Sequence, residues 1–428
     1  MARTNTIQQR FATLLVIAIA VSGSLVAARP LRILLEEGAG VATVAKGGSF
    51  DVTVSETSAP GHKALLFEPQ GDRPVPGWPA IVYAHGLCGG ADLYKDTLKH
   101  LASFGYVIVA NKEQESCRTA NPSNPIGSTF AALDTFHDMS DGKTMVSNLK
   151  AEVEWLRGLG NAGVEDNGLG IDGSKVALVG HSMGGGAVID LAADLATSDP
   201  DAIAAVLAIA PWNGINNVPR PSDVSGAIKA PLLLICSTKD QICPCSGPFG
   251  SDQGIGARGI GSIFINGWAT MALRVMFGPG HDLTWHGGVD AIFMGASARP
   301  MHENGTSTEP RNVTLVSFNE GGHFGLAGIT NESDLDNLMV DALGQSGVTG
   351  GLASAAAGTA IGMTNQKDAE AVAEDTMGLT VAFLAEHLAG VGYTYNGTAV
   401  TVPESPVSFD DVLGELQADD SAKVERAA

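Results

Sequence analysis

Positive charge is scarce in this sequence. The 428 residues include 25 lysines and arginines against 46 aspartates and glutamates, which gives a formal net charge of −21 at pH 7. A field of that sign repels the phosphate backbone of nucleic acids and the anionic surface of membranes. We therefore expect no nucleic-acid partner.

Cysteine is also scarce, with five residues in the whole chain. Cys243 and Cys245 lack the second pair of ligands that a zinc site needs, and no carboxylate at a suitable spacing accompanies His281 and His286. The sequence therefore predicts neither a metal nor a cofactor.

The same five cysteines allow some disulfide pairing in an oxidising compartment. Cys236 ends an apolar run at residues 231–236, and this position favours a small buried core residue that stays unpaired. The disulfide candidates are then Cys88, Cys117, Cys243 and Cys245. Their connectivity stays open, although a Cys88–Cys117 bridge is favoured if the third and fourth strands are neighbours.

The apolar run near the start of the chain is short. It covers residues 11–21, below the roughly 20 residues that a membrane-spanning helix needs. Arg3 and Arg10 precede it and small residues follow at 26–28, which is the pattern of a cleaved signal peptide. We expect residues 1–28 to be removed, leaving a secreted or secretory-pathway protein without a stable membrane span. An uncleaved membrane anchor is the alternative.

Four Asn-x-Ser/Thr sequons fit such export and predict a glycoprotein in a eukaryotic host. All four lie beyond residue 300, so that side of the molecule would carry the glycans. The sequons begin at Asn304, Asn312, Asn331 and Asn396.

Apolar residues and glycine are abundant. Hydrophobic residues make up 44% of the chain and charged residues 17%, and there are 54 glycines, enough for a large core with many tight turns. From residue 50 onward, apolar runs alternate with amphipathic stretches, the pattern of a mainly parallel sheet flanked by helices. This α/β pattern predicts eight strands, near residues 49–55, 64–67, 80–84, 106–110, 175–179, 203–209, 231–236 and 313–318. Helices are expected over residues 91–104, 145–159, 184–195 and 369–388.

One large domain over residues 29–400 accounts for these elements, with insertions after the seventh and eighth strands. The first insertion, residues 246–311, is rich in apolar side chains and predicts either a cap over a substrate cleft or a helix packed into the core. The second, residues 344–363, is rich in glycine and alanine. Residues 401–428 are expected to form an acidic tail, with a short helix after Ser408 and a frayed end.

The strongest chemical motif is Gly180-His181-Ser182-Met183-Gly184. It matches G-x-S-x-G and lies directly between an apolar strand and a helix, the setting in which this motif exposes a serine nucleophile. Side chains at Gly180 and Gly184 would clash in so sharp a turn, and the positive end of the helix would face the developing charge. The alternative is a glycine-rich turn with an inert serine.

A serine hydroxyl needs a histidine base, which a carboxylate must orient. Asp240 follows the seventh strand and His323 follows the last, so the chain order Ser182, Asp240, His323 is that of an α/β-hydrolase triad. Asp190 and Asp201 are weaker candidates for the acid. Three other histidines lie in the first insertion without a preceding strand: His281, His286 and His302.

An oxyanion created at the serine needs two fixed N–H donors. We assign one to the amide of Met183. The other is assigned to the amide of Leu87, in the glycine-rich loop that follows the third strand and includes His85. His85 is expected to organise this loop.

These segments resemble two branches of the α/β-hydrolases. The Gly180–Gly186 segment, Asp240 and Trp212 with Asn213 are similar to the pattern of bacterial cutinase-like polyester hydrolases and dienelactone hydrolases. Residues 85–110 resemble plant chlorophyllases as closely. The resemblance implies the α/β-hydrolase fold and makes Trp212 a candidate substrate wall, the alternative being an aromatic plug under the loop. Cys88 is a further candidate substrate contact.

The chain departs from both branches. Chlorophyllases usually carry arginine after the nucleophile, where this chain has Met183; polyester hydrolases place an aromatic residue where Leu87 stands; and compact cutinases lack the 246–311 insertion. We therefore predict a serine carboxylic ester hydrolase acting on a small-molecule or polymeric ester through an acyl-enzyme. A chlorophyllase-type esterase, acyl transfer to an alcohol, and a non-catalytic binding protein of the same fold are the alternatives. The oligomeric state stays open.

Overall fold

The structure is a computed structural model. It describes residues 44, 47–71, 74, 77–86, 89–112, 143–161, 168–213, 221–240, 243, 245–246, 288–298, 312–330, 368–388, 392–395, 398–401 and 407–427.

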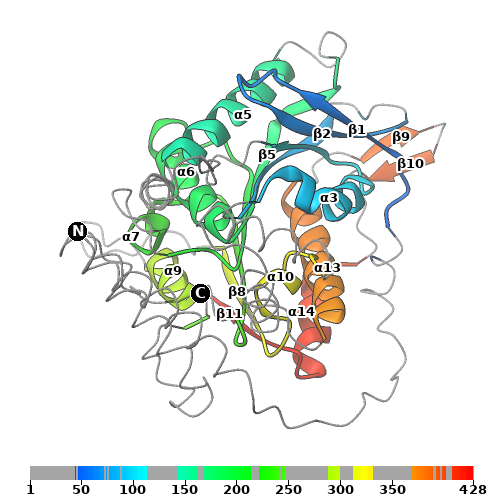
Figure 1. Ribbon diagram of the computed structural model, residues 1–428. Helices are drawn as coiled ribbons and strands as arrows, with labels where there is room; N and C mark the ends of the chain where they lie inside the picture. Colours follow the sequence, from blue (N-terminus) through cyan, green and yellow to red (C-terminus); the bar gives the residue numbers. More distant parts are fainter. Residues whose placement is uncertain are drawn as a thin grey trace, which may run out of the picture.

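A nine-stranded sheet forms the centre of the molecule, with strand order β1-β2-β4-β3-β5-β6-β7-β8-β11 (Figure 1). Strands β3 to β8 run parallel, whereas β1 and β2 at one edge and β11 at the other pair antiparallel with their neighbours. The strands are β1 (Val52–Thr57), β2 (Ala64–Pro69), β3 (Trp78–Ala84), β4 (Val107–Asn111), β5 (Ile171–His181), β6 (Ala205–Ile209), β7 (Leu232–Ser237), β8 (Val313–Phe318) and β11 (Ala422–Arg426). Strands β9 (Gly392–Tyr395) and β10 (Thr398–Thr401) form a separate hairpin.

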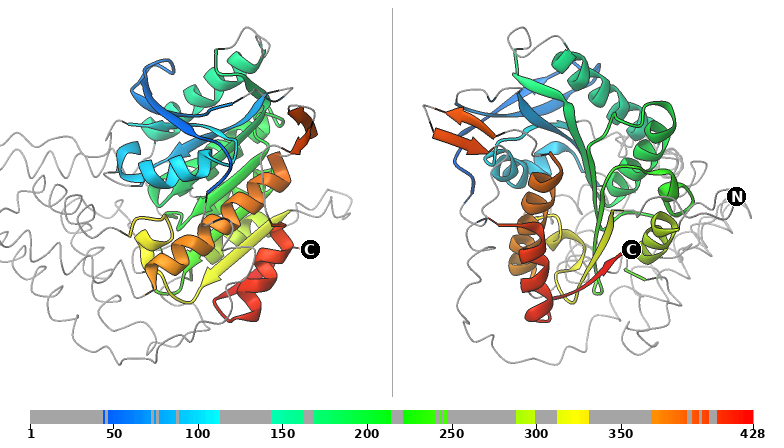
Figure 2. Two further views of the ribbon diagram at one scale, coloured as in Figure 1. Left: turned by 90° about the vertical axis from the view of Figure 1, so that its right-hand side faces the viewer. Right: turned by 180° about the vertical axis from the view of Figure 1, so that it is seen from behind.

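Helices cover both faces of this sheet, as the two views in Figure 2 show. One face packs against α3 (Lys95–Ala102), α13 (Ala369–Leu388) and α14 (Phe409–Ala418). The other face packs against α5 (Lys143–Asn161), α6 (Met183–Ser198) and α9 (Val289–Ser297). Shorter helical turns are η1 (Ala91–Tyr94), α7 (Pro221–Val224), η2 (Ser225–Ala227) and α10 (Gly322–Gly325).

The buried strands explain the two cores. Successive side chains of a strand point to opposite faces, so a strand buried on both sides is apolar throughout. In β3, Ile81 and Tyr83 join the core beneath α3 and α13, whereas Ala80 and Val82 join the core beneath α5 and α6. The mainly parallel α/β architecture predicted from the apolar runs is confirmed, and all eight predicted strands are present.

The C-terminal end differs from the prediction. Residues 422–426 were expected to fray because they are charged, but they form β11, which pairs with β8 from Ala422 opposite Phe318 to Arg426 opposite Thr314. Without β11, β8 would be an edge strand with unpaired backbone groups. Charged side chains suit the new edge because they discourage pairing with further chains.

The first insertion is described in one part, residues 288–298. Helix α9 buries Val289, Ile292 and Phe293 against the core of the α6 side, and the Asp290 amide donates to the Cys245 carbonyl at 2.7 Å. This helix therefore packs into the core. The apolar residues of the insertion that suggested a cap or a core helix, Ile263 to Phe277, lie outside the described residues, as does the segment 344–363, so the choice between cap and core helix stays a prediction. Within the described part of the chain, no helix has the length and apolar character needed to cross a bilayer.

Helix α14 is docked, and this gives a first prediction. Leu413 is buried against the α13 core, whereas Gln417 on the same helix is exposed. Leu413→Ala should lower the free energy of unfolding by about 2–5 kcal/mol, because it removes buried methyl groups and leaves a cavity. Gln417→Ala is the control and should change it by less than about 0.5 kcal/mol. Equal, small effects in urea denaturation would mean that the terminal helix does not pack as described.

Asp190 on α6 gives a second prediction. Burial raises the pKa of its carboxyl from 3.8 to about 8, and among the described residues neither carboxyl oxygen has a hydrogen-bond partner. The folded state therefore holds this proton between about pH 4 and pH 8, where the unfolded state releases it. Its contribution to stability is complete below about pH 4 and is lost as the pH rises through about 8.

Asp190→Asn imitates the protonated acid and should remove this pH dependence. We expect the variant to gain stability over the wild type as the pH rises from about 4 to about 8, measured as the free energy of unfolding in urea. Asp194→Asn, an exposed acid on the same helix, is the control. Parallel pH profiles for the wild type and Asp190→Asn would show that Asp190 is ionised in the folded protein.

Candidate active site

Ser182 occupies a strained turn between β5 and α6. Its backbone has φ 57° and ψ −121°, a region that costs a non-glycine residue on the order of 1–3 kcal/mol. Its amide donates to the Ile209 carbonyl at 2.9 Å, and its own carbonyl accepts from the Gly186 and Trp212 amides. Among the described residues, its side chain makes no capping hydrogen bond to α6, so the hydroxyl is not committed to the helix.

Two glycines make this turn possible. A Cβ on Gly180 would lie 2.4 Å from the carbonyl oxygen of Gly184, and one on Gly184 would lie 2.3 Å from that of Ala84. Real Cβ atoms do not approach backbone so closely, so both positions require glycine, as the motif predicted. The turn therefore sets Ser182 directly against the end of β3.

Asp240 lies in the turn that follows β7. Its amide donates to the Ser237 carbonyl at 3.1 Å, and its Oδ1 accepts from the Cys243 amide at 2.8 Å. Ser237 Oγ donates to the Glu320 carbonyl at 2.8 Å, which ties this turn to the loop that follows β8. The orientation of the carboxylate is thus fixed by backbone donors and by a cross-link between two neighbouring loops.

His323 lies on α10, in the loop after β8. Gly321 begins this turn in the left-handed region at φ 97°, and a Cβ there would lie 2.5 Å from Val372 Cγ1 on α13. The loop can therefore fold back beneath α13 only with glycine at this position. The turn buries the imidazole, leaving it 2% exposed.

The structure brings Asp240 and His323 into direct contact. His323 Nδ1 lies 2.7 Å from Asp240 Oδ2, and the two side chains are almost completely buried. This hydrogen bond fixes one tautomer of the ring, with the proton on Nδ1 and Nε2 free to act as a base. Ser182 lies next to this pair, because the residue before it, His181, has its ring centroid 4.6 Å from that of His323.

The weaker candidates for the acid are placed elsewhere. Asp190 is buried on α6 without contact to His323 among its described interactions, and Asp201 is exposed before β6. His281, His286 and His302 lie outside the described residues.

Cys243 is a neighbour of the site that the sequence prediction had treated as a disulfide candidate. It is a free, buried thiol, and the Ser182 side chain lies close enough to influence its pKa. Burial raises the pKa of this thiol well above its usual value, and the charge on Asp240 raises it further. The thiol therefore stays protonated beside the serine. An aspartate side chain often accepts a hydrogen bond from a backbone amide a few residues later in the chain. Asp240, three residues before Cys243, was therefore the sequence signal that could have predicted this turn.

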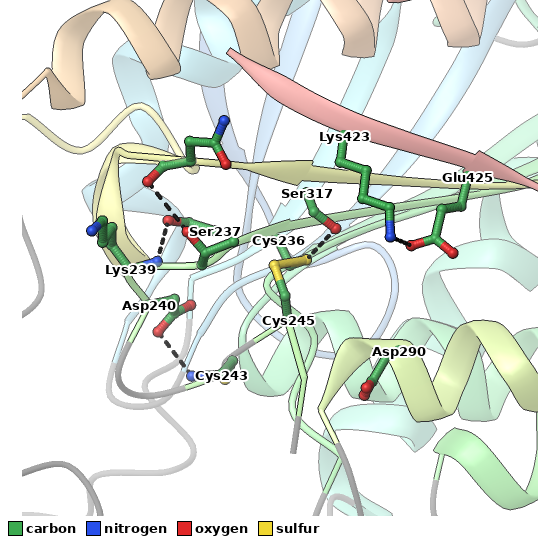
Figure 3. The surroundings of a disulfide bond; sticks show 12 residues. Cys236, Ser237, Lys239, Asp240, Cys243, Cys245, Asp290, Ser317, Lys423 and Glu425 are labelled. Carbon is green, nitrogen blue, oxygen red and sulfur yellow. Dashed lines mark hydrogen bonds and ion pairs between the residues drawn. A yellow bond between two sulfur atoms is a disulfide. The ribbon is translucent and has the colours of Figure 1, made fainter. Parts of the chain in front are cut away.

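The prediction for Cys236 was wrong, whereas Cys245, one of the disulfide candidates, does form a bridge. Cys236 is not an unpaired core residue: it forms a disulfide with Cys245, closing a loop that carries both Asp240 and Cys243 (Figure 3). Cys236 faces the α6 core from the end of β7, and the chain turns back after Asp240 to bring Cys245 within a Cα–Cα distance of 5.2 Å. Cys88 and Cys117 lie outside the described residues, although β3 and β4 are parallel neighbours as expected.

The loop after β3 lies next to Ser182. A Cβ at Gly86 would lie 3.2 Å from Ser182 Cβ, and His85 Nδ1 hydrogen-bonds the Gly86 carbonyl at 2.8 Å, in line with the expected role of His85 in this loop. The amide of Gly86 donates to the Tyr94 hydroxyl at 3.0 Å. Leu87 and Cys88 lie outside the described residues, so their expected roles stay predictions.

Met183 and Trp212 flank the serine. Met183 is the first residue of α6 and is buried, which places its amide at the positive end of the helix. Trp212 donates its amide to the Ser182 carbonyl at 2.9 Å, and its side chain is half-buried against the core of the α13 side. Both of its suggested roles, substrate wall and aromatic plug, are compatible with this position.

The comparison with known families agrees with this geometry. A family model described as Chlorophyllase matches residues 41–223, which include the turn at Ser182 and the loop at Gly86. The nine-stranded sheet and this match together show that the chain has the α/β-hydrolase fold. Asp240 and His323 lie beyond the matched segment, so their placement comes from the structure. No curated protein matches the chain.

This α/β-hydrolase should depend on the Cys236–Cys245 bridge for stability. Cys236→Ser, Cys245→Ser and the double variant should each lower the free energy of unfolding by about 2–3 kcal/mol, the loop-closure contribution of a bridge of this length. The three losses should be nearly equal, because any one of the changes removes the whole bridge. Losses that add in the double variant, or a non-reduced peptide map that pairs Cys243, would contradict the assignment.

Proposed function

We propose that the protein is a serine carboxylic ester hydrolase in which Ser182, His323 and Asp240 act as nucleophile, general base and orienting acid. The observation that carries the proposal is the buried 2.7 Å hydrogen bond between His323 and Asp240 beside the strained turn at Ser182. Such strain persists only where the surrounding structure enforces it, and it is common at reactive side chains.

The reaction would proceed in two steps. His323 Nε2 removes the proton of the Ser182 hydroxyl as Oγ attacks the ester carbonyl, and Asp240 stabilises the imidazolium that forms. The tetrahedral oxyanion is held by the amides of Met183 and Leu87, each worth roughly 3 kcal/mol of the barrier. His323 then gives its proton to the departing alcohol. Water, activated by the same imidazole, releases the acid and regenerates Ser182.

This mechanism predicts a clear ranking of variants. Ser182→Ala should reduce kcat on p-nitrophenyl esters by roughly 10⁶-fold, and Asp240→Asn by about 10³–10⁴-fold with little change in KM, because the imidazole loses its tautomer. Asp201→Asn, an exposed acid, is the control and should keep wild-type rates. A fluorophosphonate probe should label the wild type and not Ser182→Ala.

Two outcomes would contradict the proposal. Labelling that survives in Ser182→Ala would remove the serine from its role. A wild type that is inert toward both short and long esters would favour a non-catalytic binding protein of the same fold.

A chlorophyllase-type esterase is the second candidate, and the family match over residues 41–223 favours it. Met183 stands where chlorophyllases usually carry arginine, which favours a general esterase. Initial rates on chlorophyll and on a chain-length series of p-nitrophenyl esters separate the two. A kcat/KM higher on chlorophyll than on every simple ester would assign the narrower activity.

We also propose that the protein is exported after removal of residues 1–28. The Cys236–Cys245 disulfide supports this, because such bridges form and persist in oxidising compartments. Asn312, at the start of one sequon, is exposed. The other three sequon asparagines lie outside the described residues.

A further inference from the structure

Two buried side chains beside the proposed triad have no part in the mechanism above. Tyr94 ends η1 and is 1% exposed, and His181 ends β5 and is completely buried. The Tyr94 hydroxyl lies 2.9 Å from His181 Nδ1, and the two rings meet nearly edge to face. Residues 87 positions apart in the chain thus form a buried polar pair directly beside Ser182.

The pair is connected at both ends to backbone groups of the site. The Gly86 amide donates to the Tyr94 hydroxyl oxygen at 3.0 Å. At the other end, His181 Nε2 lies 3.1 Å from the carbonyl oxygen of His323. The chain of hydrogen bonds therefore runs from the loop after β3, past Ser182, to the loop after β8.

The chemistry of the end groups fixes the direction of every bond. A carbonyl oxygen only accepts, so His181 must carry a proton on Nε2 to donate to His323. A neutral His181 then has a bare Nδ1, which accepts the Tyr94 hydroxyl proton, while the hydroxyl oxygen accepts from Gly86. All of the donors and acceptors in this chain are used with His181 uncharged.

A neutral ring is what the reaction requires at this position. His323 becomes positively charged as it takes the serine proton, and a second cation 4.6 Å away would disfavour that charge. Burial lowers the pKa of His181 well below its usual value, and the charge of His323 lowers it further.

We propose that Tyr94 and His181 are positioning residues. They form an uncharged hydrogen-bonded chain, here called the relay, which holds the loop after β3 and His323 in fixed positions on either side of Ser182. The proposal rests on the hydrolase function proposed above. It differs from a purely structural role because the relay should affect kcat more than KM or stability, and because its two members should act as one unit.

A double-mutant cycle on ester hydrolysis tests this. Tyr94→Phe should lower kcat about 10-fold, because the loop after β3 and His323 are then held less well in the geometry that the transition state needs, with KM changed less than twofold. His181→Leu should lower kcat at least as much, and the double variant should lose little beyond His181→Leu alone, because either change breaks the same chain. His181→Gln, which keeps an N–H donor and a carbonyl acceptor, should recover part of the activity and serves as the second variant if His181→Leu does not fold.

The chain offers a matched control in Tyr106. It is also fully buried, but among the described residues its hydroxyl has no hydrogen-bond partner. Tyr106→Phe should leave kcat and KM unchanged. An unchanged kcat in Tyr94→Phe, equal losses in Tyr94→Phe and Tyr106→Phe, or losses that multiply fully in the double variant would each overturn the relay.

The failure of the relay can be told apart from failure of the proposed function. If the wild type hydrolyses esters and Ser182→Ala does not, the function stands and the cycle alone decides on the relay. If the wild type hydrolyses no ester, both proposals fall together.

Discussion

The site depends on one hydrogen bond, between His323 Nδ1 and Asp240 Oδ2. It forms because β7 and β8 are parallel neighbours, so the loops that follow them leave the sheet at the same edge. Ser237 and Thr238 then tie the two loops together through the carbonyls of Glu320 and Asn319. The Cys236–Cys245 bridge closes the loop that carries Asp240. These contacts fix Asp240 and His323, the proposed acid and base, before any substrate arrives, which is the preorganisation that acid–base catalysis requires.

A second constraint is the close backbone packing around Ser182. Glycines at 180 and 184 let β5, α6 and the end of β3 approach within distances that no side chain would permit. The strained serine is held there by hydrogen bonds to Ile209, Gly186 and Trp212. The proposed relay through Tyr94 and His181 extends the same design to the two flanking loops. The loops after β3, β7 and β8 are thus each held in place by hydrogen bonds to a neighbouring part of the site.

Much of this was predictable from the sequence, because the signals were local. Apolar runs located the strands of a sheet buried on both faces, and the glycine pattern around Ser182 required its turn. Asp240 and His323 followed from chain order relative to those strands. The predictions failed where the decisive contact was not local. The apolar run predicts an unpaired core residue at Cys236; the residue does lie in the core, but its disulfide partner returns nine residues later around a turn that only the fold reveals. Strand β11 was missed because its charged residues suit an edge and resemble a tail. The contact between Tyr94 and His181 has no sequence signal, since His181 fills an unspecified position of G-x-S-x-G and the spacing between the two residues reflects the topology of the sheet.

The central claim is that Ser182 is the nucleophile of a covalent mechanism, and the most direct test is to locate the acyl group during turnover. The wild type is mixed with a slowly hydrolysed p-nitrophenyl ester, quenched in acid within the first turnovers, and mapped by peptide mass spectrometry. The account predicts one acyl group, on the hydroxyl of Ser182. An acyl group on another side chain, such as the neighbouring thiol of Cys243, or hydrolysis that proceeds with no acylated peptide, would contradict it.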